Sequence, residues 1–142
     1  MYAFLEQVVA DHMTRKAETV SRAVTLRELE DLFEKDDFNA YPVEESSQVV
    51  GLVSKFDFLA CFVFTPANMV PRYDDLMNQT VSAIMTPDFI YVRGDTKLTR
   101  VLQLMVDHRI RSMPVIEDDQ RLVGMISRED VMRALQHCSS GA

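Results

Sequence analysis

The stretch GLVSKFD at residues 51–57 returns as GMISRED at residues 124–130, and this duplication decides how the chain is organised. Both copies contain a glycine, two apolar residues, a serine, two variable residues and an aspartate. The match extends upstream, where Met13-Thr14 recurs 72 positions later as Met85-Thr86. One extra residue in the second copy then shifts the offset to 73, which indicates a turn of different length in the two copies.

Each copy predicts a β-hairpin followed by a helix. The β-rich runs 40–43 and 49–53 flank a polar connector in the first copy, and the runs 112–116 and 122–126 do so in the second. The serine of each repeated motif stands where the following helix begins, so Ser-x-x-Asp has the form of a capping box. The glycine in the strand before it lets another backbone or a ligand approach closely.

An amphipathic helix is expected ahead of each hairpin, with Asp95 or Thr96 placed to cap the second one. A short strand, 19–20 or 89–92, is expected before each of these helices, which gives the order β, α, β, β, α. A unit of about 55 residues buries little apolar surface alone, so the two copies are expected to share a core. The apolar face of the second helix consists of Leu98, Val101, Leu102, Met105 and Val106, and that of the first of Leu26, Leu29, Leu32 and Phe33.

These patterns divide the chain into a first repeat at residues 8–62, a linker at 63–79 and a second repeat at 80–137. The linker contains two prolines and a polar centre, and we expect it to close with a short helical turn. The run 58–64 is apolar all round the helix that it would form. We interpret it as a dimer surface, because a small core cannot cover it wholly.

Composition narrows the classes of function. The net charge of −7 repels a phosphate backbone, so nucleic acid is not an expected partner. The longest apolar run is too short for a membrane span and the N-terminus lacks an export signal, which predicts a cytoplasmic chain without membrane contact. The two cysteines and three histidines lack the spacing of metal ligands, so we predict no metal site and no disulfide framework.

The repeated motif itself fits two purposes. Serine and aspartate can simply satisfy the amides of the first helical turn. The same geometry suits a nucleotide, because free amides attract phosphate and a carboxylate can accept both hydroxyls of a ribose. Arg109 and Arg111 precede the second hairpin where the first copy has Asp37 and Asn39. These arginines either bind phosphate or lie solvated at a helix end, and both interpretations remain open.

The whole repeat resembles the CBS domain, pairs of which form Bateman modules. The matching features are Met-Thr at 13–14 and 85–86, Pro-Val at 42–43 and 114–115, and the Gly-apolar-apolar-Ser-x-x-Asp ending. The resemblance implies an α+β fold of two tandem CBS-type βαββα repeats, related by pseudo-twofold symmetry, in one compact module. It also implies a non-enzymatic sensor or regulatory module. Such a module requires no cofactor and binds AMP, ADP or ATP, or S-adenosylmethionine or NAD, in the cleft between the repeats.

The family's residue roles can be carried over to matching positions. Serine contacts phosphate or ribose and aspartate binds the ribose hydroxyls, which assigns these roles to Ser54 and Asp57, and to Ser127 and Asp130. The base is held by strand side chains and backbone, here residues 17–20 or 89–92. The complete set of expected nucleotide-binding residues is Thr14, Val20, Gly51, Val53, Ser54, Asp57, Thr86, Ile90, Tyr91, Arg109, Arg111, Gly124, Ile126, Ser127 and Asp130.

Two other functions remain open at this point. A purely structural dimerisation module with vestigial sites fits the same sequence, because the variable residues of the motif differ between the copies. A nucleotide-processing enzyme would need a nucleophile with a general base or a metal cluster, and neither Ser54 nor Ser127 has a histidine at a matching position. With no catalytic domain attached, we expect a homodimer that regulates an unidentified protein partner in trans.

Overall fold

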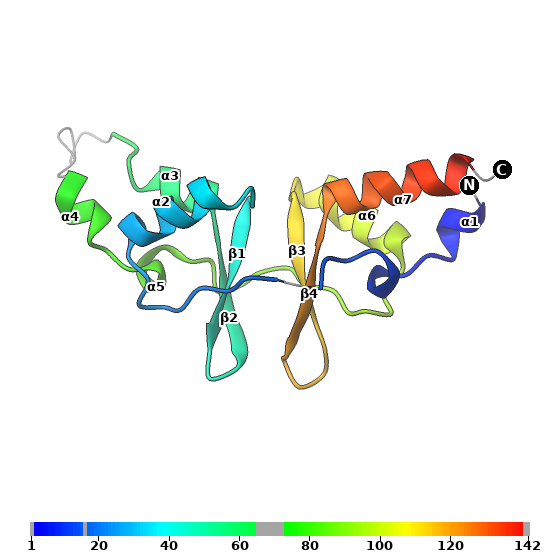
Figure 1. Cartoon of the computed structure of the whole chain (residues 1–142), viewed down its shortest axis with the longest axis horizontal. Helices are drawn as coiled ribbons and strands as arrows, with labels where there is room; N and C mark the ends of the chain where they lie inside the picture. The colour runs from blue at the N-terminus through cyan, green and yellow to red at the C-terminus, as the bar shows by residue number, and fades with distance from the viewer. Residues whose placement is uncertain (1, 16, 65–72, 141–142) are drawn as a thin grey trace. The chain divides into compact units, whose positions relative to one another are not determined.

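Two antiparallel β-hairpins organise the computed structural model of the chain, which describes residues 2–15, 17–64 and 73–140 (Figure 1). The chain divides into two compact units. One unit is Glu18–Phe89, and the other joins Met1–Ala17 to Ile90–Ala142. The opening of the first repeat therefore folds with the second hairpin, and the opening of the second repeat folds with the first hairpin. Each unit combines one two-stranded sheet with several helices, which confirms the predicted α+β class.

The unit Glu18–Phe89 packs its helices around the first hairpin. Leu26 and Leu29 of the helix before the hairpin are fully buried, together with Val43 and Val53 of the strands. The predicted helix and hairpin are thus confirmed. The elements are α2 (Leu26–Lys35), β1 (Ala40–Glu45), β2 (Gln48–Ser54), α3 (Lys55–Ala60), α4 (Tyr73–Met77) and α5 (Val81–Ile84).

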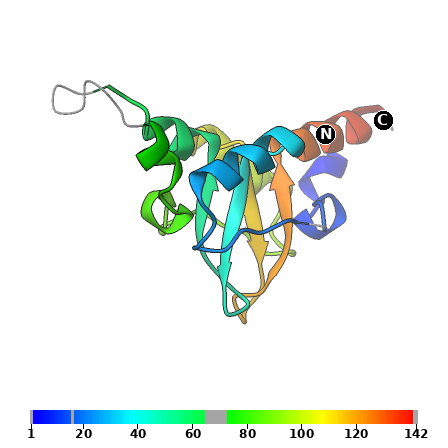
Figure 2. The same cartoon turned by 60° about the vertical axis from the view of Figure 1, so that its left-hand side comes forward.

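The second unit repeats this plan around the second hairpin. Leu98 and Val101 of the helix before the hairpin are fully buried with Val115 and Ile126 of the strands. Helix α1 lies beside α7, the helix that leaves the end of the hairpin directly (Figures 1 and 2). The elements are α1 (Tyr2–Leu5), η1 (Val9–Asp11), α6 (Leu98–His108), β3 (Ser112–Ile116), β4 (Leu122–Ser127) and α7 (Arg128–Ser140).

The start of α6 differs from the prediction. The helix begins after Lys97, and no side chain caps it. The Thr96 hydroxyl instead accepts a hydrogen bond from the Arg93 amide at 3.0 Å, and Asp95 pairs with the Arg93 guanidinium at 3.7 Å. Both proposed caps are therefore used within the turn before the helix. Helix α2, in contrast, begins with a complete capping box between Thr25 and Glu28.

The short strands and the apolar run 58–64 also differ from the prediction. The short strands predicted before each long helix are single parallel bridges, Val20 to Val43 and Val92 to Val115. The apolar run 58–64 is not one helix, because α3 ends at Ala60. Some of its side chains turn back onto the core while others are exposed: Phe58, Cys61 and Phe62 pack against the core, and Leu59, Val63 and Phe64 are exposed.

Tyr41 anchors the end of α2 to the hairpin. Its side chain is 1% exposed, and its hydroxyl contacts the Leu32 carbonyl and the Asp36 carboxylate, each at 2.9 Å. Burial raises the pKa of this phenol, and the Asp36 carboxylate raises it further. Asp36 follows the last residue of α2, so the hydroxyl binds two acceptors at one helix end.

We expect Tyr41→Phe to lower the free energy of unfolding by about 1 kcal/mol. The ring still fills its place in the core, so the loss is that of one hydrogen-bonding hydroxyl near the Leu32 carbonyl. Urea denaturation followed by circular dichroism measures the change. An unchanged midpoint would show that this hydroxyl adds nothing to stability.

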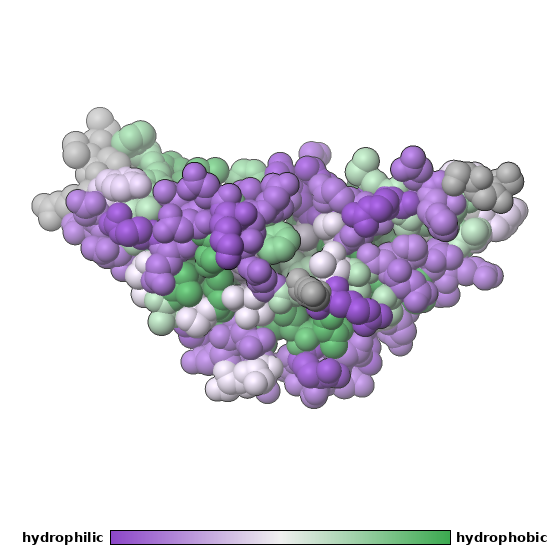
Figure 3. Space-filling model, in the orientation of Figure 1, coloured by the Kyte–Doolittle hydropathy of each residue, from purple (hydrophilic) through white to green (hydrophobic). Residues whose placement is uncertain are grey.

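The surface is mainly polar on the face shown in Figure 3, in keeping with the net charge of −7. None of the described helices combines the length and the apolar composition that crossing a bilayer requires. Within the described residues, no group of three or more His, Cys, Asp or Glu side chains is arranged to hold a metal ion.

Candidate functional site

The glycine of the second motif lies where the opening of the first repeat meets β4. Thr14 and Met125 form an antiparallel bridge with N–H to carbonyl distances of 2.8 and 2.9 Å. A Cβ atom on Gly124 would lie 2.7 Å from the Thr14 carbonyl oxygen and 2.9 Å from the Met13 sulfur. A real side chain does not fit there, so glycine is required by close approach of the backbone.

The first motif has the same arrangement with the opening of the second repeat. Leu52 and Thr86 bridge with N–H to carbonyl distances of 2.9 and 2.7 Å. A Cβ atom on Gly51 would lie 2.8 Å from the Met85 sulfur and 3.2 Å from the Thr86 carbonyl oxygen. The Met-Thr pair at the opening of each repeat therefore lies beside the glycine motif of the other repeat.

Residues 54–57 form the first corner, where β2 turns into α3. The Ser54 amide donates to the Asp57 carboxylate at 2.8 Å, and the Asp57 amide donates to the Ser54 hydroxyl at 3.1 Å. The second carboxylate oxygen lies 3.5 Å from the Thr86 hydroxyl. Burial raises the pKa of the nearby Cys61 thiol, and the Asp57 charge raises it further. The first corner thus collects Ser54, Asp57 and Thr86 in one place.

Residues 127–130 form the second corner, where β4 turns into α7. The Ser127 amide donates to the Asp130 carboxylate at 2.9 Å, and the Asp130 amide donates to the Ser127 hydroxyl at 3.3 Å. The other carboxylate oxygen lies 3.3 Å from the Arg133 guanidinium, whose side chain is 70% exposed. Asp130 itself is 3% exposed. The second corner therefore holds a buried carboxylate at the start of a helix of 13 residues.

Each corner presents the same chemistry. One carboxylate oxygen is fixed by the serine amide, which sets the orientation of the whole group. The second oxygen has a long contact with the Thr86 hydroxyl in the first corner and with the exposed Arg133 in the second. A ligand hydroxyl can replace either of these contacts without breaking the capping box. The arrangement suits a ligand that offers a diol, because a carboxylate is an acceptor on both oxygens.

The CBS domain family model matches residues 9–63 and 81–137. The chain belongs to the CBS domain family. The family resemblance drawn from the sequence is thereby confirmed, and the chain contains a tandem pair of CBS domains.

Relatives in this family include CBSX1, a chloroplastic CBS domain-containing protein of Arabidopsis thaliana. It is 30% identical over 89% of this chain and 63% of its own length. The chain spans 43% to 63% of the length of the first curated relatives that it matches.

Solved structures of CBS domain pairs have the same fold. CBSX2 of Arabidopsis thaliana in complex with AMP is 25% identical, with a TM-score of 0.79 over 93% of this chain and 98% of that one. The pair of MJ0100, in complex with 5′-methylthioadenosine and S-adenosylmethionine, is 22% identical with a TM-score of 0.77. The superposition covers 93% of this chain and 98% of the MJ0100 pair. At 22% identity this likeness concerns the fold alone.

Several of the predicted nucleotide-binding residues have side chains that are buried in the hydrophobic cores of the two units. Val53 and Ile126 are fully buried, and Val20 is buried where it bridges to Val43. Only the backbone of these residues is left for contact with a ligand. Ile90 is half-buried against the core of its unit, while the Tyr91 side chain is 55% exposed. Their roles in binding stay predictions.

The two arginines of the second CBS domain differ in position. Arg109 follows the last residue of α6 with a left-handed backbone (φ 53°), and its amide closes the helix on Met105. The Arg111 carbonyl accepts the amide of Arg128 at 2.9 Å, which places its backbone directly beside the second corner. Both side chains are exposed. Of the two, Arg111 is therefore the better placed to meet a ligand at Ser127 and Asp130.

Proposed function

We propose that this chain is a regulatory module that binds an adenosine-containing nucleotide at its Ser-x-x-Asp corners. AMP, 5′-methylthioadenosine and S-adenosylmethionine share an adenosine group, and these are the ligands in the CBSX2 and MJ0100 complexes. CBSX2 matches nearly the whole chain at 25% identity. Ribose recognition by the serine and aspartate that the two corners share would serve any of these ligands.

The main support for the proposal is that the Asp130 carboxylate is buried while one of its oxygens is weakly bonded. Among the residues that the structure describes, it is the one charged side chain that is buried. Burying a carboxylate is costly unless its oxygens are well bonded. Here one oxygen is held by a backbone amide and the other contacts an exposed, flexible arginine. A ribose diol would complete the bonding of this carboxylate.

The second corner suits a phosphorylated nucleotide better than the first corner does. Arg111 lies beside it, and a guanidinium group binds phosphate oxygens with paired donors. The equivalent residue of the first CBS domain is Asn39, whose carbonyl accepts the Lys55 amide at 3.0 Å. We therefore propose that AMP, ADP or ATP binds at the second corner in preference to an uncharged adenosine derivative.

We propose that nucleotide binding changes how the module associates with a second copy of itself and with a protein partner. The module acts as a homodimer on a protein partner in trans, and exposed apolar side chains on and after α3 support such association. Those exposed by more than half are Phe56, Leu59, Val63 and Phe64. A nucleotide changes the assembly only to the extent that it binds one packing state more tightly than the other.

Calorimetric titration of the chain with AMP, S-adenosylmethionine and GMP tests the proposal. We expect saturable binding of AMP, with GMP weaker by about tenfold or more, because guanine presents different hydrogen-bonding groups; that ratio equals about 1.4 kcal/mol. Weaker binding of S-adenosylmethionine than of AMP would support the role of Arg111. Absence of heat with every adenosine ligand, at millimolar concentration, would refute nucleotide binding.

A purely structural dimerisation module is the second candidate. The observation in its favour is that the capping bonds alone account for both serines and both aspartates. Sedimentation velocity separates the two functions. A structural module gives one oligomeric state with and without AMP, whereas a sensor changes its sedimentation or its contact with a partner when AMP is added.

A further inference from the structure

A hollow lies beside the loop that joins β3 to β4, and no residue of the second corner lines it. It has a volume of about 570 Å³ and belongs wholly to the unit that joins Met1–Ala17 to Ile90–Ala142. Ala10, Met13 and Val123 supply an apolar lining, and Glu117 and Arg121 supply charge. We call this space the tip hollow. None of the residues assigned to nucleotide binding lines it.

The other unit shows what fills the same place. Arg22 is the counterpart of Gly94, 72 positions earlier, just as Glu45 is the counterpart of Glu117. The Arg22 Nε atom lies 2.8 Å from a Glu45 carboxylate oxygen, and its Nη1 lies 3.4 Å from the Ser82 hydroxyl. In the first CBS domain, the Arg22 guanidinium therefore occupies the position beside Glu45.

Position 94 of the second CBS domain has no side chain that could pair with Glu117, and the Arg93 guanidinium approaches this carboxylate at 3.7 Å. A Cβ atom on Gly94 would lie 3.0 Å from a Glu117 carboxylate oxygen and 3.5 Å from the Ala10 methyl group. Ala10 is the counterpart of Ser82. A side chain at position 94 would thus pass between Ala10 and Glu117, as Arg22 passes between Ser82 and Glu45. The backbone permits one, because Gly94 does not have a positive φ.

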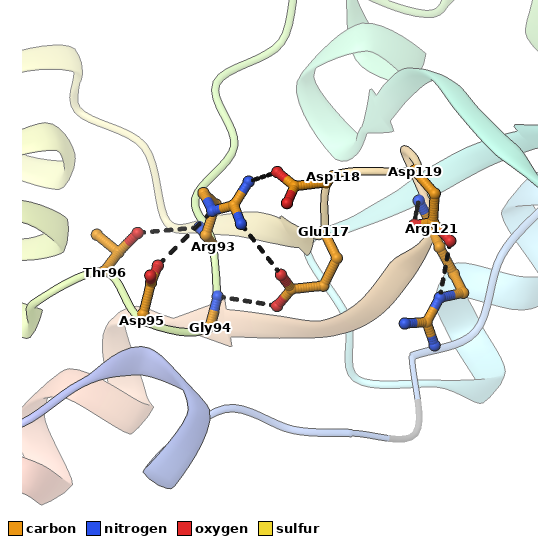
Figure 4. Close-up of polar contacts among 8 residues, drawn as sticks. All are labelled: Arg93, Gly94, Asp95, Thr96, Glu117, Asp118, Asp119 and Arg121. Carbon is orange, nitrogen blue, oxygen red and sulfur yellow. Dashed lines mark hydrogen bonds and ion pairs between the residues drawn. The ribbon is translucent and has the colours of Figure 1, made fainter.

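The charges around the tip hollow favour a cation (Figure 4). Arg93 pairs with Asp95 and Glu117, each at 3.7 Å, and with Asp118. The Gly94 amide donates to Glu117 at 3.3 Å, and both residues line the hollow. Asp119 and Arg121 form a separate pair at 3.4 Å.

The network is not neutral. It contains four carboxylates and two guanidinium groups, and Arg15 on the rim still leaves one negative charge in excess. The guanidinium of Arg15 donates to the Ala10 carbonyl at 3.0 Å, which keeps it at the rim. The tip hollow thus combines an apolar lining with an excess of one negative charge in the network around it.

We infer that the tip hollow binds an alkylguanidinium group supplied from outside the chain, as in free arginine or in an arginine side chain of a peptide. The guanidinium lies against Glu117, in the position that Arg22 takes against Glu45. The alkyl part packs on Met13 and Val123. A planar guanidinium matches a carboxylate with paired donors, and its stem covers apolar surface. The site is independent of nucleotide binding.

Two-dimensional ¹H–¹⁵N NMR of the full chain tests this inference with ethylguanidinium as the probe. The Gly94 amide is the reporter, because it donates to Glu117. We expect its signal to shift saturably, and the affinity to fall by about tenfold in Glu117→Gln, since a charged partner is lost. Glu45→Gln is the matched control and leaves the affinity unchanged. Gly94→Arg abolishes binding, because the new side chain occupies the hollow.

The tripeptide Gly-Arg-Gly forms the second arm of the titration. Tighter binding of the tripeptide than of ethylguanidinium assigns the site to a protein partner, and equal or weaker binding assigns it to a small molecule. The inference is overturned if neither probe shifts Gly94 saturably, or if Glu117→Gln leaves the affinity unchanged. Should Gly94→Arg fail to fold, the comparison of Glu117→Gln with Glu45→Gln still decides the question.

Discussion

Gly124→Val is expected to lower the free energy of unfolding by about 3 kcal/mol, at the upper end for an overpacked site. A Cβ atom at this position would lie 2.7 Å from the Thr14 carbonyl oxygen, so either the strand or the opening of the first repeat must move. Both hydrogen bonds between Thr14 and Met125 are strained or lost as a result. Chemical denaturation of the purified variant measures the effect.

Gly94→Ala is the matched control for that variant. Its Cβ atom would lie 3.0 Å from the end of the Glu117 side chain, which can shift, rather than from a backbone carbonyl. Although Gly94 is buried, we expect a loss of no more than about 1 kcal/mol, because the contacted end of the Glu117 side chain can move aside. Equal destabilisation by Gly124→Val and Gly94→Ala would contradict the view that backbone approach is what demands glycine in β4.

Asp130→Asn is expected to weaken AMP binding by about 10- to 100-fold, the loss for a hydrogen bond to a charged acceptor. Asparagine keeps one oxygen to accept the Ser127 amide, so the cap of α7 is retained. It replaces the second oxygen by an amide nitrogen, which cannot accept a ribose hydroxyl. Calorimetry against AMP, with circular dichroism to confirm folding, measures the loss.

The neighbouring Glu129→Gln serves as the control for Asp130→Asn. It removes one negative charge from an exposed position of the same helical turn, so a general electrostatic effect would appear in both variants. We expect Glu129→Gln to bind AMP as the unmodified chain does. If Asp130→Asn folds and binds AMP with unchanged affinity, the carboxylate is a helix cap and has no role with a ligand.

The sequence was sufficient to predict features that depend on local contacts. Both hairpins, the long helices and the Ser-x-x-Asp caps follow from periodicity and from residues three positions apart, and the structure contains them. The caps are local because the serine hydroxyl and the aspartate carboxylate reach amides within one helical turn. Roles in nucleotide binding need a ligand and stay predictions.

Features for which the sequence offers more than one partner could not be predicted. The two copies offer equivalent strands to each opening, so nothing in the sequence says that Thr14 pairs with Met125 and Thr86 with Leu52. Thr96 had the right type and place for a helix cap, but its hydroxyl binds the Arg93 amide instead. In both cases the choice between competing contacts decides the outcome.

The tip hollow illustrates how a single difference between repeats creates a new feature. Alignment of the copies pairs Gly94 with Arg22, yet by itself this says only that one position has lost a side chain. The structure adds that Arg22 contacts Glu45 and that the matching Glu117 borders an open space. The two CBS domains have therefore diverged in charge in the turn before the long helix, at Arg22 and Gly94.

A crystal structure of the chain grown with AMP would show whether Asp130 binds the ribose. We expect the ribose hydroxyls to lie about 3 Å from the Asp130 carboxylate, a normal hydrogen-bond distance, with the phosphate close to Arg111. A second AMP molecule bound at Asp57 would show that the first corner also binds nucleotide. AMP bound away from both aspartates, with each carboxylate contacting only its capping amide and its present neighbour, would contradict ribose binding by Asp130.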